Sequence, residues 1–332
     1  MQKILSSFGI PAAVTLVALG AVGYWLGPTA FFTALLLVIL EVTLSFDNAV
    51  INAKVLAEMS PLWQGRFLTW GILIAVFLTR MILPILIVSI SIATSPWTVT
   101  QLAFNNPHEY AHLLEGAKYA IYSFGGIFLL LVGLKYFFDE RKENHWIQVV
   151  EEHLSKWSSV EAIEMFVSLV VLGVIAYALP LQSSTILFAG IIGMGLFIMV
   201  QGLASAFSVK SSHTAGAGFA LFVYLNILDA AFSLDSVVGA FALSTQIAVI
   251  TVGLGIGAYF VRALTIYMVH HRTLHGLIYI ENGAHWAILG LAGAMFASLF
   301  VNVPEPITGF IGLLFVGFAY WSSVKLVSEI AA

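Results

Sequence analysis

The sequence contains no cysteine and very little charge. Without cysteine, disulfide bonds, thiolate zinc sites, iron–sulfur clusters and thiol catalysis are excluded. Charged residues make up 9% of the 332 residues and hydrophobic residues 60%, whereas soluble proteins carry about 25% charged residues. This composition excludes an ordinary soluble enzyme and a nucleic-acid-binding protein, and the net charge of -4 excludes a polybasic partner surface. What is left is a polytopic membrane protein whose sites consist of oxygen and imidazole groups.

Ten segments of the chain are apolar enough to cross a bilayer, which takes about 20 residues per helix. They are 9–27, 30–53, 67–94, 116–138, 161–179, 183–203, 219–243, 246–269, 283–302 and 306–328. We therefore expect an all-α polytopic membrane protein with about ten transmembrane helices. The first segment, behind Lys3, resembles a signal peptide, but no small-residue cleavage site follows it, so we expect it to be kept as a span.

The positive charges predict the orientation, because cytoplasmic loops carry an excess of Lys and Arg. With ten spans nearly all of these residues fall on one side, and Lys118, at a span end, is the exception. The residues on that side are Lys3, Lys54, Arg66, Lys135, Arg141, Lys142, Lys156, Lys210, Arg272 and Lys325. Both termini are therefore expected in the cytoplasm.

Two polar segments divide the apolar chain. We expect 139–160 to be a cytoplasmic amphipathic linker helix, or else a solvated linker without a role of its own, and 204–217 to be a flexible connection. The predicted organisation is an N-terminal helix (1–29), a first transmembrane repeat (30–138), the linker (139–160), connecting helices (161–218), a second repeat (219–302) and a C-terminal helix (303–332).

Two acidic motifs recur with identical spacing inside apolar spans. The first consists of Glu41, Ser45, Asp47 and Asn48, and the second of Asp229, Ser233, Asp235 and Ser236. Each copy also has an arginine in a later span, Arg80 or Arg262. The copies begin at the second and seventh spans, and this odd separation places the second copy upside down relative to the first. Two inverted three-helix repeats with polar residues near the midplane are typical of secondary transporters.

A third match supports the repeat: GAKYAIYSFGG at 116–126 resembles GAHWAILGLAG at 283–293. An acid closely precedes each stretch, Glu115 in the first copy and Glu281 in the second. Inversion places these acids at opposite mouths of the protein, where they would draw cations toward the centre. Alternatively, they are helix N-terminal acids that the helix macrodipole favours.

The six midspan charges define a candidate ion site. Each ionisable residue at the centre of a transmembrane helix costs about 2.5–3.5 kcal/mol, so these residues persist only in a polar cavity where they neutralise one another. Four carboxylates against two guanidinium groups leave a formal charge of -2, which one divalent cation or two protons would balance. A purely structural network of salt bridges is the alternative.

Helical phase limits how the first motif can form one site. At 100° per residue, Glu41, Ser45, Asn48 and Asn52 lie on one face, while Asp47 points about 120° away from Glu41. Both acids reach one site only if the helix is locally unwound or lies between two helices. Unwound carbonyls would add oxygen ligands, which favour hard cations.

At these motifs the chain resembles the TerC family of integral membrane proteins, named for tellurium resistance. The resemblance lies in EVTLSFDNAV, LDAAFSLDSVVGAF and FGGIFLLLVGL (124–134), and extends from about residue 35 to 300. It implies membership of the lysine-exporter superfamily, a bacterial inner membrane location and manganese efflux. It also implies metal ligation by Glu41, Asp47 and Asn48 of the first motif and by Asp229 and Asp235 of the second. The second copy has Ser236 where the first has Asn48, so the site need not be symmetric.

The sequence therefore predicts a secondary transporter that exports a divalent cation, Mn²⁺ by resemblance, in exchange for protons. It predicts neither an enzyme nor a bound cofactor, and the partners are the cation, protons and the lipid bilayer. Ca²⁺ is the main rival substrate, because oxygen ligands serve both ions. A membrane scaffold or tellurium-type stress-resistance protein without transport is the rival function, and the sequence leaves a homo-oligomer open.

Two histidine groups offer competing sites. The stretch from His108 to His112 spells the H-E-x-x-H zinc-protease motif, with Glu109 as its base and Glu115 as a conceivable third ligand. The soluble domain that a protease needs is missing, so an external metal-collecting patch or an interfacial helix without chemistry are the other interpretations. His270, His271 and His275, beside Arg272, suggest metal capture at an inner vestibule or plain loop histidines at the headgroup boundary.

Overall fold

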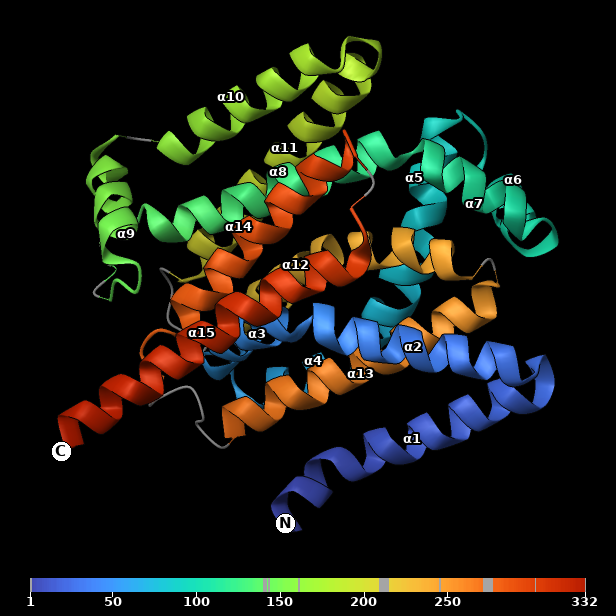
Figure 1. Ribbon diagram of the computed structural model, residues 1–332, viewed down its shortest axis with the longest axis horizontal. Helices are drawn as coiled ribbons and strands as arrows, with labels where there is room; N and C mark the ends of the chain where they lie inside the picture. Colours follow the sequence, from blue (N-terminus) through green and yellow to red (C-terminus); the bar gives the residue numbers. More distant parts are fainter. Residues whose placement is uncertain are drawn as a thin grey trace. The chain divides into compact units, whose positions relative to one another are not determined.

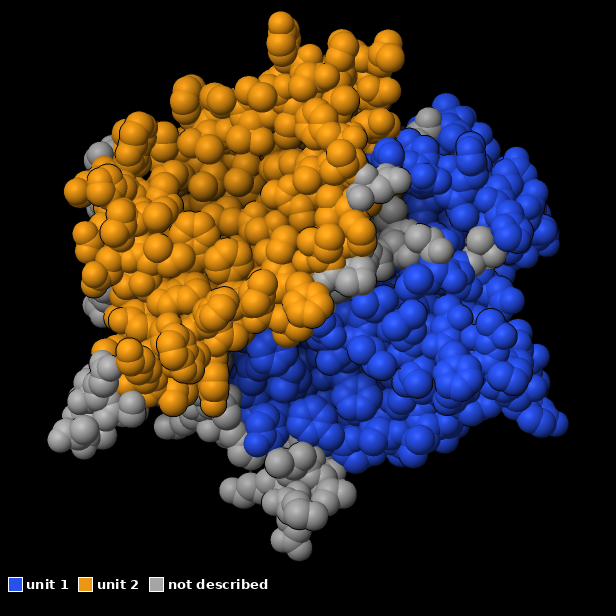
Figure 2. All heavy atoms as spheres, viewed as in Figure 1, with its two compact units in different colours: residues 1–118, 210–270 blue, residues 119–209, 271–332 orange. Residues whose placement is uncertain are grey.

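The protein is all-helical across the residues that the structure, a computed structural model, describes: 2–139, 142, 144–160, 162–208, 215–244, 246–270, 277–301 and 303–331. These residues form two compact units, and each unit combines segments that are far apart in the chain (Figure 2). Unit 1 comprises 1–118 and 210–270, and unit 2 comprises 119–209 and 271–332.

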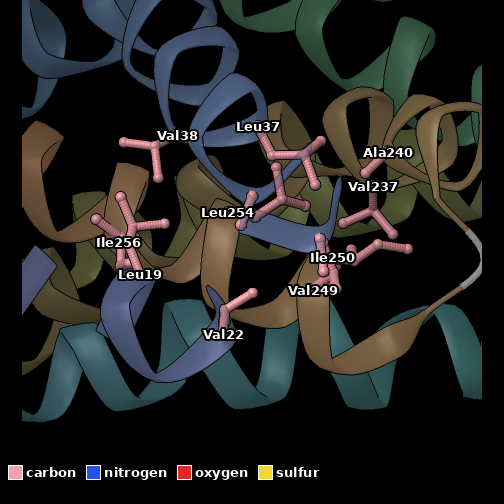
Figure 3. Close-up of a cluster of buried hydrophobic side chains, with 12 residues drawn as sticks. Leu19, Val22, Leu37, Val38, Val237, Ala240, Val249, Ile250, Leu254 and Ile256 are labelled. Atoms are coloured by element: carbon pink, nitrogen blue, oxygen red, sulfur yellow. The ribbon is translucent and has the colours of Figure 1, made fainter. Parts of the chain in front are cut away.

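Unit 1 contains both acidic motifs. Its elements are α1 (Gln2–Leu26), α2 (Pro28–Leu44), α3 (Phe46–Ala57), α4 (Pro61–Leu73), the π-helical η1 (Ile74–Ile82), α5 (Leu83–Ser91), α6 (Pro96–Asn105), α7 (Pro107–Gly116), α12 (Ala215–Leu243) and α13 (Ile247–His270). Helix α13 packs along α2, and both contact α1 (Figure 1). Buried side chains such as Leu37, Leu254 and Val237 fill the core between α2, α13 and α12 (Figure 3).

Unit 2 contains the predicted linker and the connecting helices. Its elements are α8 (Lys118–Phe137, apart from the first residue), α9 (Gln148–Ser155), the 3₁₀ turns η2 (Lys156–Ser159) and η3 (Pro180–Gln182), α10 (Ile163–Ala178), α11 (Ser183–Ser208), α14 (Ile280–Ser298) and α15 (Glu305–Ala331). Helices α14 and α15 lie side by side along much of their length (Figure 1).

Several helices have the length and apolar character of membrane spans. Within the described residues, five qualify alone: Phe8–Leu26, Pro61–Ile90, Lys118–Phe137, Pro180–Gly202 and Ile247–Val269. The bent pair Pro28–Thr43 and Asn48–Ala57 makes a sixth, and three shorter apolar helices, Ile163–Ala178, Gly218–Ser233 and Phe310–Leu326, coincide with further predicted spans. The structure therefore fits an all-α membrane protein, while the ten-span count and the inverted repeats stay predictions.

Large apolar side chains are exposed along α1, α10 and α11. Trp25 is 77% exposed at the end of α1, and Tyr177 and Leu181, at the turn between α10 and α11, are 90% and 91% exposed. Such a surface in water would promote aggregation. Aromatic residues at helix ends are typical of the interface between membrane and water. These exposures therefore fit a lipid environment.

In unit 1 the helix ends sort into two groups. Leu26 and Thr29, at the turn from α1 to α2, line the same pocket as Leu243 and Ser244 at the end of α12. At the opposite end, Trp63 at the start of α4 packs on Phe219 and Phe222 at the start of α12. The ten-span scheme places the first group outside and the second inside, so the grouping agrees with it.

In unit 2, helix ends that the ten-span scheme places inside contact one another. The end of α8 meets the start of α10 through Lys135 and Glu164, whose charged atoms are 3.2 Å apart. The start of α14 meets the later part of α15, where the Tyr279 N–H donates to Ser323 Oγ at 2.9 Å. All of these positions are inside in the ten-span scheme. Which end of either unit faces the cytoplasm stays a prediction.

Single cysteine substitutions test this arrangement of the helix ends. The chain has no cysteine of its own, so only the introduced residue is labelled. We expect Thr29→Cys and Gln246→Cys to react with an impermeant maleimide from one side of the membrane. Glu58→Cys and Asn144→Cys should react only from the other side. Labelling of Thr29→Cys and Gln246→Cys from opposite sides would contradict the arrangement of unit 1.

Candidate functional site

The first acidic motif lies at a break in its helix. Helix α2 ends at Leu44 and α3 begins at Phe46, with Ser45 between them at φ -99° and ψ 15°. The two segments are bent by 56°. This break separates Glu41 from Asp47, as one of the two arrangements allowed by helical phase requires. In the second copy, by contrast, α12 runs unbroken through Asp229 and Asp235.

Arg80 lies on η1, a π-helical segment inside a long apolar span. Pro84 follows four residues later, and in a regular α-helix its ring would clash with the carbonyl of Arg80. The wider π-helical turn relieves this conflict, and such segments occur frequently at functional sites. Arg80 Nη1 donates to the carbonyl of Ala75, five residues earlier, at 2.7 Å.

Glu41 and Arg80 form an ion pair inside unit 1. Arg80 Nη2 donates to Glu41 Oε1, which also accepts a hydrogen bond from Ser45 Oγ at 3.1 Å. The whole residues are only 1% and 4% exposed. Charges of this kind persist in a low-dielectric interior only when they are paired. Each of the two therefore neutralises the other.

Asp229 and Arg262 form the matching pair in the second copy. Arg262 Nη2 donates to Asp229 Oδ2 at 2.8 Å, and Nη1 donates to the Phe67 carbonyl at 3.1 Å. The guanidinium also lies over the Phe67 ring, 4.2 Å from its centroid. Each acid thus pairs with the arginine of its own copy.

Asn48 joins the two copies. Its Nδ2 donates to Asp229 Oδ1 at 2.9 Å, so the first motif contacts the second directly. We call Glu41, Ser45, Asn48, Arg80, Asp229 and Arg262 the central cluster.

Two glycines permit this close approach. A Cβ atom on Gly257 would lie 2.5 Å from Glu41 Cβ, and one on Gly71 would lie 2.4 Å from Arg262 Nη1. The glycines therefore bring α13 against α2 and α4 against the guanidinium.

The central cluster keeps unused hydrogen-bonding capacity. Among the described residues, Glu41 Oε2 and Asn48 Oδ1 are buried acceptors without a donor, and the Nε atoms of Arg80 and Arg262 are donors without an acceptor. Buried polar atoms are ordinarily paired, so each exception requires an explanation, such as an ion or water. The two oxygens are suitable ligands for a hard cation.

Other predicted site residues lie on the same elements. Asp47 is on α3 and Asp235 is on α12, but their side chains are outside the described part of the structure. Ser233 and Ser236 are buried, and Ser236 Oγ donates to the Ser233 carbonyl of its own helix at 3.1 Å. Among the described residues, which leave out the side chains of Asp47 and Asp235, no three His, Cys, Asp or Glu side chains form a metal-ligand group.

The glutamate of the H-E-x-x-H stretch, Glu109, takes part in capping the start of α7. Asn106 Oδ1 accepts from the Glu109 N–H at 3.4 Å, and Asn106 Nδ2 donates to Glu109 Oε2 at 2.7 Å. These bonds tie Glu109 to Asn106, the residue that caps the start of α7. His108 and His112 are exposed on α7. This geometry favours a helix without chemistry over a protease base.

The remaining predicted residues fall elsewhere. The side chain of His270, and residues His271, Arg272 and His275, lie outside the described residues. Glu281 lies in the first turn of α14, as the macrodipole interpretation requires. Glu115 lies in the last turn of α7, before α8 begins, so that interpretation does not fit it.

A further buried carboxylate, Glu151, anchors the predicted linker, and the sequence did not predict it. Glu151 is 0% exposed on α9. It accepts five hydrogen bonds, from Lys142 Nζ (2.6 Å), Trp146 N (3.0 Å), Asn282 Nδ2 (2.7 Å), Ile147 N (3.2 Å) and Trp286 Nε1 (2.8 Å). This burial does not fit the interpretation of 139–160 as a solvated linker, while the role of the segment stays a prediction. Neighbouring Glu152 is exposed, and nothing in the local sequence distinguishes the two acids.

The surroundings of Glu151 also determine its titration. Burial raises the pKa of Glu151, but hydrogen bonds from Lys142, Trp286 and the Ile147 N–H outweigh burial, so the pKa lies below 4.5. Burial lowers the pKa of Lys142, although the contact with Glu151 opposes this. A carboxylate with a lowered pKa stabilises the fold above its unfolded pKa.

For the central cluster, we expect Arg80→Met to lower the free energy of unfolding by about 3–5 kcal/mol, because it leaves Glu41 buried and unpaired. Adding Glu41→Gln should restore much of this loss. Lys135→Met is the matched control: Lys135 is 54% exposed in its pair with Glu164, and such pairs contribute about 0–1 kcal/mol. Unfolding monitored in detergent measures all three. Additive losses in the double variant would contradict the pairing.

For Glu151, we expect Glu151→Gln to lower the free energy of unfolding by about 3 kcal/mol, because Lys142 is left without its counter-charge. In the wild type this contribution should be complete above about pH 4.5 and fall as the pH drops through the lower folded pKa. Melting temperatures measured from pH 3 to 7 test both expectations. Glu152→Gln, one residue on, should behave as the wild type; equal effects of the two substitutions would contradict the anchor.

Comparison with known proteins adds a family but no described relative. No curated protein and no solved structure matches the chain. A family described as "Protein of unknown function (DUF475)" matches residues 46–328, which include α3, both arginines and the second acidic motif. Because this match covers most of the sequence, the chain belongs to the DUF475 family.

Proposed function

We propose that this protein is a secondary transporter that exports a divalent metal cation, with Mn²⁺ as the first substrate to test, in exchange for protons. The observation that carries the proposal is the central cluster itself. Two acid–arginine pairs lie buried among apolar helices, beside carboxylate and amide oxygens that lack partners. A structural network would ordinarily satisfy these oxygens.

The charge balance supports cation exchange. Glu41 and Asp229 are each neutralised by an arginine. The formal charge of -2 in the six midspan residues therefore rests on Asp47 and Asp235. We propose that these two aspartates exchange a divalent cation for two protons, because carboxylates bind metal when ionised and carry protons when neutral.

The break at Ser45 supports a transport role. Discontinuous helices near the midplane are typical of secondary transporters, where unwound carbonyls and helix ends coordinate ions. The α2–α3 break lies next to Glu41 and Asn48. The oxygen-rich set favours hard cations over soft ones. Manganese itself is supported by the TerC resemblance, which also suggests a bacterial inner membrane. The distribution of Lys and Arg residues supports both termini in the cytoplasm.

Two alternatives compete with this proposal, one for the substrate and one for the function. Calcium satisfies the same oxygen chemistry. One observation favours a membrane scaffold: Glu41 and Asp229 each form an ion pair with an arginine. Ion pairs of this kind also occur in purely structural networks.

Purified protein in liposomes tests the activity. We expect Mn²⁺ to quench an internal metal-sensitive dye when a pH gradient is imposed, and an internal pH dye to report proton movement in the opposite direction. Parallel runs with Ca²⁺, Zn²⁺ and Mg²⁺ define the substrate. No response to any divalent cation under either gradient direction would remove the proposal.

The aspartate variants separate transport from scaffolding. Asp47→Asn and Asp235→Asn should accumulate as folded protein and lose transport by more than about tenfold, because each removes an exchangeable charge. Thr265→Val is the matched control: Thr265 is buried in unit 1 and donates only to the Val261 carbonyl of its own helix. Loss of folded protein in both Asn variants would favour the scaffold.

A further inference from the structure

Two buried asparagines lie one helical turn from the central cluster. Asn52 follows Asn48 on α3, and Asn226 precedes Asp229 on α12. They are 2% and 8% exposed, and the Oδ1 atom of each has no hydrogen-bond partner among the described residues. Neither belongs to the two acidic motifs.

The two helices run in opposite directions at this place. Asn48 contacts Asp229 at one level. Further along α3, Leu56 shares a buried apolar cluster with Phe222 and Leu225 of α12. The steps from Asn48 to Asn52 and from Asp229 to Asn226 therefore lead the same way, by about 6 and 4.5 Å along the axes. Both asparagines lie on the Trp63 side of the central cluster.

The orientation of the Asn226 amide is determined by its contacts. Its Nδ2 donates to the Phe222 carbonyl at 2.7 Å, so the oxygen is the atom left free. A flipped amide would place its oxygen against that carbonyl. Arg262 does not satisfy this oxygen: its Nη1 and Nη2 atoms donate to Phe67 and Asp229, and no described residue donates to Asn226 Oδ1.

Among its described residues, unit 1 therefore contains four buried acceptor oxygens without a partner, at two successive levels. Glu41 Oε2 and Asn48 Oδ1 lie in the central cluster, and Asn52 Oδ1 and Asn226 Oδ1 lie at the next level. The first level holds charged ligands, whereas the second is neutral.

We propose that Asn52 and Asn226 form a second binding step for a partly hydrated divalent cation, on the Trp63 side of the central cluster; this step rests on the transport function proposed above. Amide oxygens are ligands for hard cations but carry no charge, so they hold such an ion less tightly than carboxylates do. Passage along a path requires sites that bind an ion and also let it leave. A neutral step beside a charged one meets this requirement.

The substitutions with leucine remove the oxygens. We expect Asn226→Leu and Asn52→Leu to slow Mn²⁺ transport in liposomes by about tenfold, the factor that corresponds to 1.4 kcal/mol. Binding of Mn²⁺ to the detergent-purified variants, followed by the electron paramagnetic resonance of free Mn²⁺, should keep its affinity within about twofold. Wild-type transport rates in both leucine variants would overturn the step.

The substitutions with aspartate keep the size and add a charge, so they test the step if the leucine variants fail to fold. We expect Asn226→Asp and Asn52→Asp to bind one more Mn²⁺ per chain than the wild type, because a carboxylate holds the ion more tightly. Thr265→Val should show wild-type stoichiometry and rate. If both aspartate variants bind the same number of Mn²⁺ ions as the wild type, and the wild type transports Mn²⁺, the second binding step is overturned and the proposed function stands. If the wild type does not transport Mn²⁺, the proposed function itself is refuted.

Discussion

The pairing of buried charges is the constraint on which the structure of unit 1 depends. A carboxylate among apolar helices is tolerated only beside a counter-charge and hydrogen-bond donors. Glu41 reaches Arg80, and Asp229 reaches Arg262. Both contacts require helices to approach closely, and Gly257 and Gly71 stand where a Cβ atom would prevent this. The π-helical turn before Pro84 belongs to the same solution, because it carries Arg80.

The sequence predicted those features that depend on local patterns of apolar and charged residues. Apolar runs predicted an all-helical membrane protein, and the described residues are helical with several span-length helices. Repeated spacing selected Glu41, Asp229 and the two arginines, because charges in apolar spans are too costly to be incidental. Helical phase required an interruption or a two-sided helix, and the break lies at Ser45.

Features that depend on tertiary contacts could not be predicted in this way. The sequence did not show that each acid pairs with the arginine of its own motif, since the separations of 39 residues (Glu41 to Arg80) and 33 residues (Asp229 to Arg262) do not determine which side chains meet between helices. Asn226 lies three residues before Asp229, a spacing that places the two on one helix face. This spacing could have predicted that Asn226 lies near the site. Glu151 is buried while Val149, two residues earlier, is 77% exposed, so hydropathy points the wrong way in α9.

The two acidic motifs lie on helices of different structure, and this difference bears on how the predicted repeat would work. The first copy has a broken helix, a π-helical arginine and an asparagine that crosses to the second copy. The second has one continuous helix whose Ser236 hydroxyl bonds its own backbone. A continuous helix keeps Asp229 at a fixed level, whereas a break allows α3 to change its angle to α2 by rotating few backbone bonds. Under the proposed exchange function, a change of angle at this break would alter the ligand distances of α3 while the buried arginine pairs stay closed.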